Sequence, residues 1–150
     1  MKVLCTHICR IVILLTGLTA CNTARVNHSA PDEETIFRSS TGEPVTIAND
    51  SLEYEIIIIE PGFDAWLNSV ARPEGYYSQS FLENRNQVYV VNWNQRVREP
   101  HRYNPDLYGM IIDYDPHIDY GYEVNYKLYC YFIYFQRKYR QQLAGFIPRI

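Results

Sequence analysis

The sequence predicts a small single α+β domain in which two or three helices pack on a short two-stranded sheet. A β-branched run at 54–59 and a long amphipathic helical pattern at 120–142 predict these elements. A hydrophobic content of 47% against 21% charged residues argues against disorder, and a length of 150 residues favours one domain. We expect a signal peptide at 1–20, a lipidated cysteine and flexible tether at 21–51, the globular domain at 52–143 and a C-terminal tail at 144–150.

The first twenty residues have the three parts of a secretory signal peptide. Lys2 and Arg10 form the basic flank, and residues 11–18 form an apolar core that is too short to span a bilayer. The sequence Leu-Thr-Ala-Cys at 18–21 resembles a bacterial lipobox, so we predict that Cys21 is lipidated. The alternative is an ordinary signal peptide that a cysteine follows by chance. Several acyl chains on one cysteine anchor a protein stably without a transmembrane helix.

The residue after Cys21 bears on the membrane to which the lipid would attach the protein. It is Asn22, whereas an aspartate would favour the inner membrane by analogy with Gram-negative sorting, so we expect the periplasmic face of the outer membrane. Cys5 and Cys9 would leave with the signal peptide, so Cys130 would have no internal disulfide partner. The formal charge of −3 becomes −5 without the two basic residues of the signal peptide, which argues against a nucleic-acid partner.

The sequence after Cys21 predicts a flexible tether followed by strands. Residues 22–50 are rich in serine, threonine, asparagine and proline and have few large apolar residues, which is typical of a flexible segment. The run Tyr-Glu-Ile-Ile-Ile-Ile at 54–59, closed by Pro-Gly, predicts a strand buried on both faces. We expect a second strand beside it within 107–114, around Met-Ile-Ile at 110–112.

Two helices are predicted in the middle of the chain. Residues 63–71 favour a short helix with Asp64 near its N-cap. A longer helix is expected from Ser80 to Arg98, because Ser80 and Glu83 have the spacing of a capping box. Pro100 then ends this helix.

The last helix has the clearest pattern. It is predicted over 120–142, where apolar side chains recur at intervals of three and four residues. That stripe consists of Val124, Leu128, Phe132, Phe135 and Tyr139. A second stripe of aromatic and aliphatic residues lies beside it, and such a wide apolar arc favours a helix buried between other elements.

Three segments resemble a known group of proteins. They are Glu60–Leu67, Tyr89–Asn94 and Ile118–Tyr129. From Glu53 to about Tyr139 the chain resembles a family of short Gram-negative envelope lipoproteins that is described only as a domain of unknown function. The resemblance implies an envelope lipoprotein, and it brings no activity and no site residue with it.

The best candidate metal ligands are Asp113, Asp115, His117 and Asp119, which alternate along the chain. On an extended strand they would share one face, and carboxylates favour a hard cation such as Ca²⁺. However, Pro116 interrupts a regular strand. The alternative, which we prefer, is that Asp115 or Asp119 caps the last helix.

Candidate catalytic groups are few. Glu60 and Asp64 are four residues apart, and glycosidases use paired carboxylates. We prefer the interpretation that Glu60 is a strand-end charge and that Asp64 caps a helix. Cys130 with His101 or His117 has the residue types of a nucleophile and its base, yet a thiol inside an aromatic helix is expected to be buried and inert. The sequence has no nucleophile-elbow, metalloprotease or phosphate-loop motif. We therefore expect no enzyme activity and no cofactor.

The tyrosine content is the unusual feature, with 14 tyrosines, of which all but Tyr54 lie at 76–139. Tyrosine and tryptophan are enriched at interfaces. The candidate binding surface contains Trp66, Trp93, Tyr122, Tyr126, Tyr129 and Tyr134. The alternative, which we prefer, is a tyrosine-rich core whose hydroxyl groups reach the surface.

Together these features predict a non-catalytic, lipid-anchored envelope protein that binds a protein partner. A second hypothesis is a small-ligand or glycan binder that uses a Tyr/Trp groove with Trp66 or Trp93 exposed. A third is a hydrolase acting through the carboxylate or histidine candidates. The sequence leaves the oligomeric state open.

Overall fold

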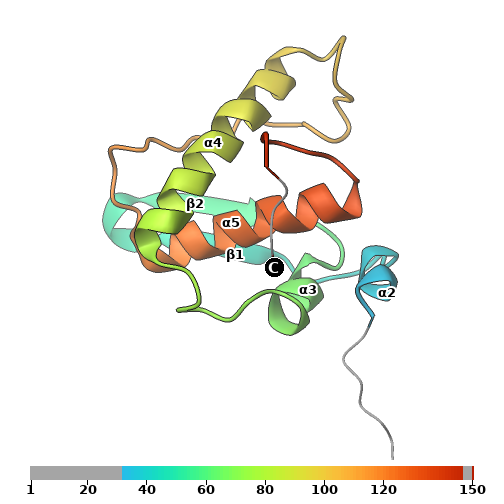
Figure 1. Ribbon diagram of the computed structural model, residues 1–150, viewed down its shortest axis with the longest axis horizontal. Helices are drawn as coiled ribbons and strands as arrows, with labels where there is room; N and C mark the ends of the chain where they lie inside the picture. The colour runs from blue at the N-terminus through green and yellow to red at the C-terminus, as the bar shows by residue number, and fades with distance from the viewer. Residues whose placement is uncertain (1–31, 147–149) are drawn as a thin grey trace, which may run out of the picture.

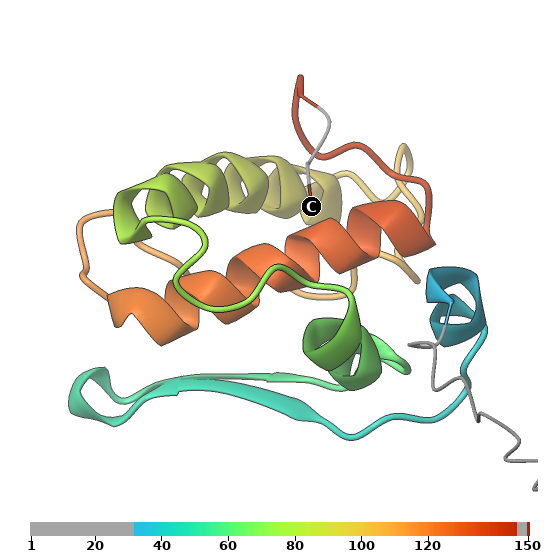
Figure 2. The same cartoon turned by 60° about the horizontal axis from the view of Figure 1, so that its bottom comes forward.

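A two-stranded sheet and two long helices lie one above another. The computed structural model describes residues 32–146 and residue 150. In chain order its elements are α2 (Glu33–Phe37), β1 (Val45–Asn49), the 3₁₀ helix η1 (Asp50–Leu52), β2 (Tyr54–Ile58), α3 (Phe63–Ser69), α4 (Gln79–Arg98) and α5 (Gly121–Lys138), as Figure 1 shows. Figure 2 shows α5 between the sheet on one side and α4 on the other. The predicted small α+β domain is confirmed.

The sheet is a hairpin of neighbouring strands. β1 and β2 pair antiparallel, with Ile47 opposite Ile56 and Val45 opposite Ile58. Ile47 and Ile58 are buried, whereas Ile57 points to the other face and is exposed. β2 is therefore buried on one face only, and the prediction of a strand buried on both faces is wrong.

The predicted strand at 107–114 does not form. That segment is irregular, and β1 takes the position beside β2. Asn94 on α4 supplies the physical reason. Its side-chain amide donates to the carbonyl oxygen of Ile112 and accepts from the backbone N–H of Ile112, both at 2.8 Å. Because both backbone groups of Ile112 are bonded to this side chain, they do not pair with a strand.

The predicted flexible tether is wrong for the larger part of its length. Helix α2 and strand β1 lie within it, and Ile36 and Ile47 are buried in the core. Glu33 also ties α2 to α3 and α5 by hydrogen bonds. A few buried side chains are sufficient to order this segment, because the other helices supply the rest of the apolar surface of the core. The signal peptide, Cys21 and residues 22–31 lie outside the described residues.

Helix α3 begins where the sequence predicts and ends two residues earlier than expected. Its N-cap is Gly62, with a φ of 85°, and Asp64 lies in the first turn instead of at the cap. A Cβ atom at position 62 would lie 2.5 Å from the carbonyl oxygen of Ile36. The glycine therefore allows α2 and α3 to approach each other closely.

Helix α4 ends at the predicted residue but has a different cap. The side chain of Ser78 accepts a hydrogen bond from the backbone N–H of Phe81 at 3.3 Å, so Ser78 is the N-cap. The predicted capping box of Ser80 and Glu83 is wrong, and Glu83 accepts instead from the side chain of Gln79 at 2.8 Å. Serine is a preferred N-cap residue, and Ser78 and Ser80 are only two residues apart. The sequence alone therefore does not show which of the two caps the helix.

Helix α5 forms the centre of the core. It has 18 residues, and most of them are buried, as expected for a helix with neighbours on two sides. The predicted apolar stripe through Val124, Leu128 and Phe132 is buried. The helix ends at Lys138, before the predicted end, because Arg140 has a φ of 50°. Within the described part of the chain, no helix is both long enough and apolar enough to span a membrane.

Candidate functional site

The predicted aromatic surface is part of the core. Trp66 and Tyr134 are fully buried, Trp93 is 4% exposed, and Tyr126 and Tyr129 are buried as well. Of the six predicted residues, only Tyr122 is partly exposed. The candidate aromatic surface is therefore wrong, and the preferred alternative of a tyrosine-rich core describes the structure. The glycan-binding hypothesis depended on an exposed tryptophan and loses that support.

Two of the buried tyrosines, Tyr126 and Tyr114, have hydroxyl groups with hydrogen-bond partners within the fold. The hydroxyl of Tyr126 donates to the carbonyl oxygen of Arg72 at 2.7 Å. The hydroxyl of Tyr114 donates to the side-chain oxygen of Asn125 at 2.8 Å. Burial raises the pKa of Tyr126, and it raises the pKa of Tyr114 to about 12. Both groups stay neutral at physiological pH and act as hydrogen-bond donors within the fold.

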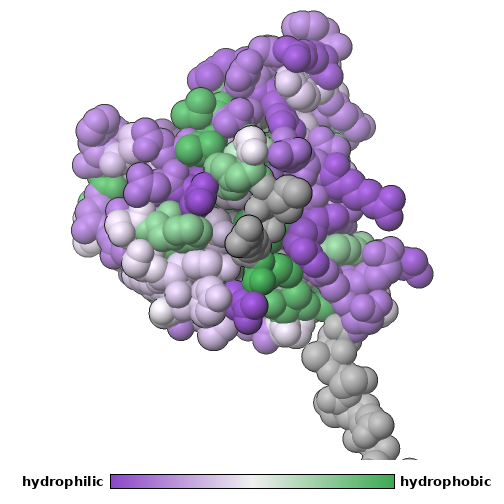
Figure 3. All heavy atoms as spheres, in the orientation of Figure 1, coloured by the Kyte–Doolittle hydropathy of each residue, from purple (hydrophilic) through white to green (hydrophobic). Residues whose placement is uncertain are grey.

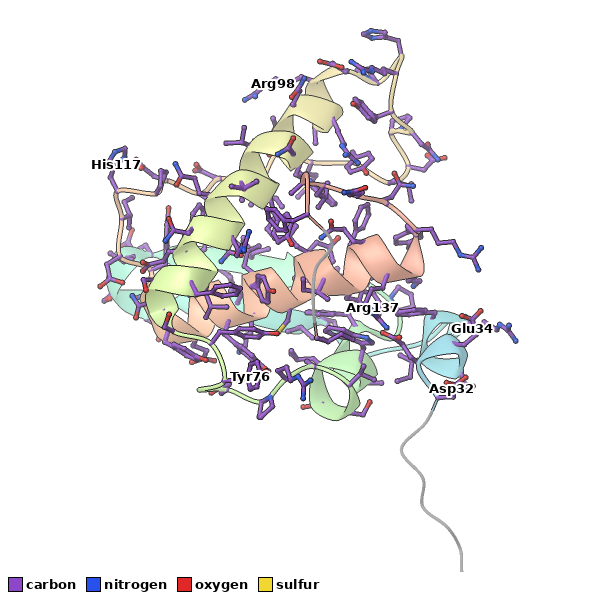
Figure 4. All side chains as sticks on the ribbon, in the orientation of Figure 1. Asp32, Glu34, Tyr76, Arg98, His117 and Arg137 are labelled. Carbon is purple, nitrogen blue, oxygen red and sulfur yellow. The ribbon has the colours of Figure 1, made fainter. Side chains whose placement is uncertain are left out.

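The four predicted metal ligands do not come together. Asp115 accepts from the backbone N–H of His117 at 2.9 Å and lies 2.8 Å from its ring nitrogen, and these bonds lower the pKa of Asp115. Asp119 accepts from the backbone N–H of Gly121, the first residue of α5, at 2.9 Å. The N-cap of α5 is Tyr120, so Asp119 lies one residue before the cap, and neither it nor Asp115 is the N-cap residue. Figure 4 shows His117 on the outer side of the loop between α4 and α5. In the described part of the chain, no three His, Cys, Asp or Glu side chains are placed to hold a metal ion.

Two of the catalytic candidates, Glu60 and Cys130, are held within the fold, whereas His101 is exposed and one side-chain oxygen of Asp64 is buried without a hydrogen-bond partner among the described residues. Glu60 accepts from Lys138 at 2.6 Å and from the hydroxyl of Tyr139 at 2.7 Å. Cys130 is a buried free thiol whose pKa burial raises to about 12. A thiol with this pKa is almost entirely protonated at neutral pH and is a poor nucleophile.

A concave feature lies beside β2. We name it the edge groove, and its volume is about 610 Å³. It is lined by residues 53–60 of β2 and its flanks, by Asp106, Leu107 and Gly109–Asp113, and by Trp93, Leu128 and Tyr131. In Figure 1, the segment that follows residue 106 passes behind α4 and runs along the side of β2 that faces away from β1.

One wall of the edge groove is an unpaired strand edge. β2 pairs with β1 on one side only. On its other side, no backbone hydrogen bond joins residues 54–58 to any other described segment. Such an edge offers a row of N–H and C=O groups to an incoming chain.

The opposite wall is fixed to α4. The indole N–H of Trp93 donates to the carbonyl oxygen of Met110 at 2.8 Å, and Asn94 holds both backbone groups of Ile112. These three hydrogen bonds keep the segment away from β2. The space between the two walls therefore follows from Asn94 and Trp93 and does not depend on a bound molecule.

Apolar side chains are exposed on both walls. Ile57 is 54% exposed and Ile59 is 78% exposed on the β2 side, and Met110 is 77% exposed on the other side. On the face that Figure 3 shows, the apolar residues instead form small patches between hydrophilic residues. Large apolar side chains grouped around a hollow mark interaction sites more often than scattered ones do.

The edge groove is negatively charged. Its lining contains five acidic residues and none of the described lining residues is Lys, Arg or His. Glu60 is neutralised by Lys138. The other four form no ion pair with a described residue, and they are Glu53, Glu55, Asp106 and Asp113. The groove is therefore both apolar and anionic.

Comparison with known families covers nearly the whole sequence. A family model for a family of unknown function, DUF6146, matches residues 11–148. The chain belongs to this family. No curated protein and no solved structure matches the sequence. The predicted membership of an uncharacterised family is confirmed, and membership of DUF6146 assigns no activity and no site residue.

Sequence reasoning did not select the residues of the edge groove. Ile57 was assigned to a fully buried strand, and Met110 to a second strand of the sheet. One signal was present in the run at 54–59, which has apolar residues at consecutive positions. When only one face of a sheet is covered, every second one of these residues is left exposed. The partner wall is about fifty residues further along the chain, and no local pattern links the two.

Glu33 makes the stability of the domain depend on pH. Burial raises its pKa, but hydrogen bonds from Arg137 and Trp66 and the charge of Arg137 outweigh burial, so the pKa is lower than its usual 4.5. Figure 4 shows Arg137 near the end of α5, beside α2. A carboxylate whose pKa is lower in the folded than in the unfolded protein stabilises the fold at pH values above its unfolded-state pKa. That contribution is lost as the pH falls through the folded-state pKa. We expect the free energy of unfolding to decrease below pH 4.5.

A matched pair of variants tests this. Glu33→Gln is expected to lower the free energy of unfolding at pH 7 by about 1 kcal/mol and to flatten its decrease in acid. Glu34→Gln, on the same helix, removes an exposed ion pair with Arg38. It is expected to change the free energy of unfolding at pH 7 by less than about 0.5 kcal/mol. Urea unfolding at pH 7 and pH 4 measures both. An unchanged acid response in Glu33→Gln contradicts the role given to Glu33.

Proposed function

We propose that this protein is a lipid-anchored protein of the bacterial envelope, on the periplasmic face of the outer membrane, and that it binds a partner protein without catalysing a reaction. The observation that carries the proposal is the edge groove. Its unpaired strand edge, exposed apolar walls and anionic lining are features of a protein-binding surface.

The proposed anchor is Cys21, and the length of chain behind it limits the position of the domain. Ten residues separate Cys21 from Asp32, where the described part begins. A chain of ten residues reaches at most about 36 Å when fully extended. A lipid on Cys21 would therefore keep the edge groove close to the bilayer and within reach of partners in the same membrane.

The state of the reactive side chains supports binding over catalysis. The carboxylate of Glu60 is held by Lys138 and Tyr139. The pKa of Cys130 is raised by burial. Both groups therefore have structural roles within the fold, whereas the exposed apolar side chains of the edge groove have no such role.

The first arm of the test concerns the anchor. In a Gram-negative host, the protein is expected to incorporate radiolabelled palmitate and to remain with the outer-membrane fraction. Cys21→Ser is expected to lose both the label and the membrane association. Equal labelling of the two chains contradicts the proposed anchor.

The second arm concerns the edge groove. A photo-cross-linking amino acid at position 57 is expected to give one discrete protein adduct in cells, which mass spectrometry identifies and co-purification at fixed stoichiometry verifies. The same amino acid at position 91 is the control, because Val91 is 61% exposed on α4 and does not line the groove. Equal adducts from both positions, or none from position 57, contradict the proposed binding function.

A further inference from the structure

The edge groove defines the conformation of the partner segment as well as its location. The free edge of β2 runs the length of the groove, and the strand has five residues. A partner strand that matched it would extend for about 17 Å. Main-chain pairing with an exposed edge is a common way for a protein to capture an extended peptide.

The two faces of the sheet define which side chains such a strand needs. Side chains of an added strand alternate between the two faces. Those on the inner face would meet Trp93, Leu128 and Tyr131 at the base of the groove, so apolar residues fit there. Those on the outer face would lie beside Glu55 and Ile57, which are exposed. An opposite charge beside Glu55 is stabilising across a strand pair.

Charge distinguishes a foreign strand from a second copy of this chain. Pairing two β2 edges would bring the carboxylates of Glu53 and Glu55 of one copy near those of the other. Like charges that face each other across a strand pair are destabilising. The four unpaired carboxylates of the groove instead attract a cationic segment and speed its association.

We infer that the edge groove binds an extended segment of a partner protein in which apolar residues alternate with Lys or Arg, and that this segment adds to β2 as a third strand of the sheet. This inference rests on the proposed protein-binding function and names the chemistry of its partner. The acidic residues of the groove select the basic strand, and the edge of β2 provides its main-chain hydrogen bonds.

Blocked seven-residue peptides test the inference with the full mature chain. The probes are a Lys/Val alternating peptide, a Glu/Val alternating peptide, and the Lys/Val peptide with every backbone nitrogen methylated. Fluorescence anisotropy is expected to show that the Lys/Val peptide binds at least tenfold more tightly than the other two. Hydrogen exchange is expected to slow at amides of β2 when it binds. Equal binding of the methylated peptide overturns strand addition, because methylation removes the N–H donors and keeps the charge.

Two variants test the charge. Glu55→Lys lies in the groove and is expected to weaken the preference for the Lys/Val peptide over the Glu/Val peptide, because it removes one of the four unpaired carboxylates and adds a positive charge beside the strand edge. Glu74→Lys is the control, since Glu74 is an exposed acidic residue that does not line the groove, and it is expected to keep the original preference. An unchanged preference in Glu55→Lys overturns the inference.

The outcomes separate this inference from the proposed function. A protein adduct at position 57 together with no binding of the Lys/Val peptide leaves the proposed function standing and overturns strand addition. An adduct formed with a second copy of this chain also overturns the inference. Peptide binding that passes every control, together with no adduct at position 57 in cells, supports the strand site and contradicts the proposed function in the envelope.

Discussion

Trp66→Ala is expected to lower the free energy of unfolding by about 3–5 kcal/mol. Trp66 is fully buried, its ring packs edge-on against Tyr134 with 5.7 Å between ring centroids, and its indole N–H donates to Glu33 at 2.7 Å. Alanine would leave a large cavity and remove one of the donors that bind the Glu33 carboxylate. Because a domain of this size has about 5–15 kcal/mol of stability in total, the variant is expected to be close to unfolding at 37 °C.

Trp66→Phe is the matched control for this prediction. It keeps an aromatic ring in the core and removes the indole donor, so it is expected to cost about 1–3 kcal/mol. Urea unfolding followed by circular dichroism measures both variants. If Trp66→Ala costs no more than Trp66→Phe, cavity formation is not the dominant cause and the packing described for Trp66 is contradicted.

The helical core could be predicted from sequence because its information is local. The stripe through Val124, Leu128 and Phe132 repeats at helical spacing, and the structure buries that stripe. The end of α4 before Pro100 is equally local, since proline interrupts a helix wherever it occurs. Short patterns of this kind identify elements without reference to the rest of the fold.

The sheet could not be predicted because its pairing depends on distant side chains. Met-Ile-Ile at 110–112 has the composition of a strand, yet Asn94 bonds both backbone groups of Ile112. The actual partner of β2 lies in a polar segment with few large side chains, where Ile47 alone is fully buried. Strand composition indicates which segments are able to pair, and tertiary contacts decide which of them do.

The candidate site was mispredicted for a related reason. Aromatic content alone does not tell whether a tyrosine is in the core or at an interface, because its hydroxyl is satisfied by water or by a carbonyl such as that of Arg72. The edge groove joins two segments that are far apart in sequence and have no shared motif. Only the three-dimensional arrangement shows that Ile57 and Met110 line one hollow.

Gly62→Ala is expected to lower the free energy of unfolding by about 2–5 kcal/mol. Gly62 has a φ of 85°, and an L-residue in the left-handed region costs about 1–2 kcal/mol. The new Cβ would also lie 2.5 Å from the carbonyl oxygen of Ile36 and 3.0 Å from the hydroxyl of Tyr134. Overpacking of this kind adds about 1–3 kcal/mol, because the Ile36 carbonyl belongs to the backbone and moves only if α2 separates from α3.

Gly75→Ala separates the two contributions to that prediction. Gly75 has a nearly identical φ of 84°, and a Cβ there would meet no atom within 4 Å. It is therefore expected to cost only the conformational term of about 1–2 kcal/mol. Hydrogen exchange is expected to accelerate at the amides of α2 in Gly62→Ala and to stay unchanged there in Gly75→Ala. Equal losses of stability in the two variants, with α2 protected in both, would show that the close approach of α2 to Gly62 does not hold this helix on the domain.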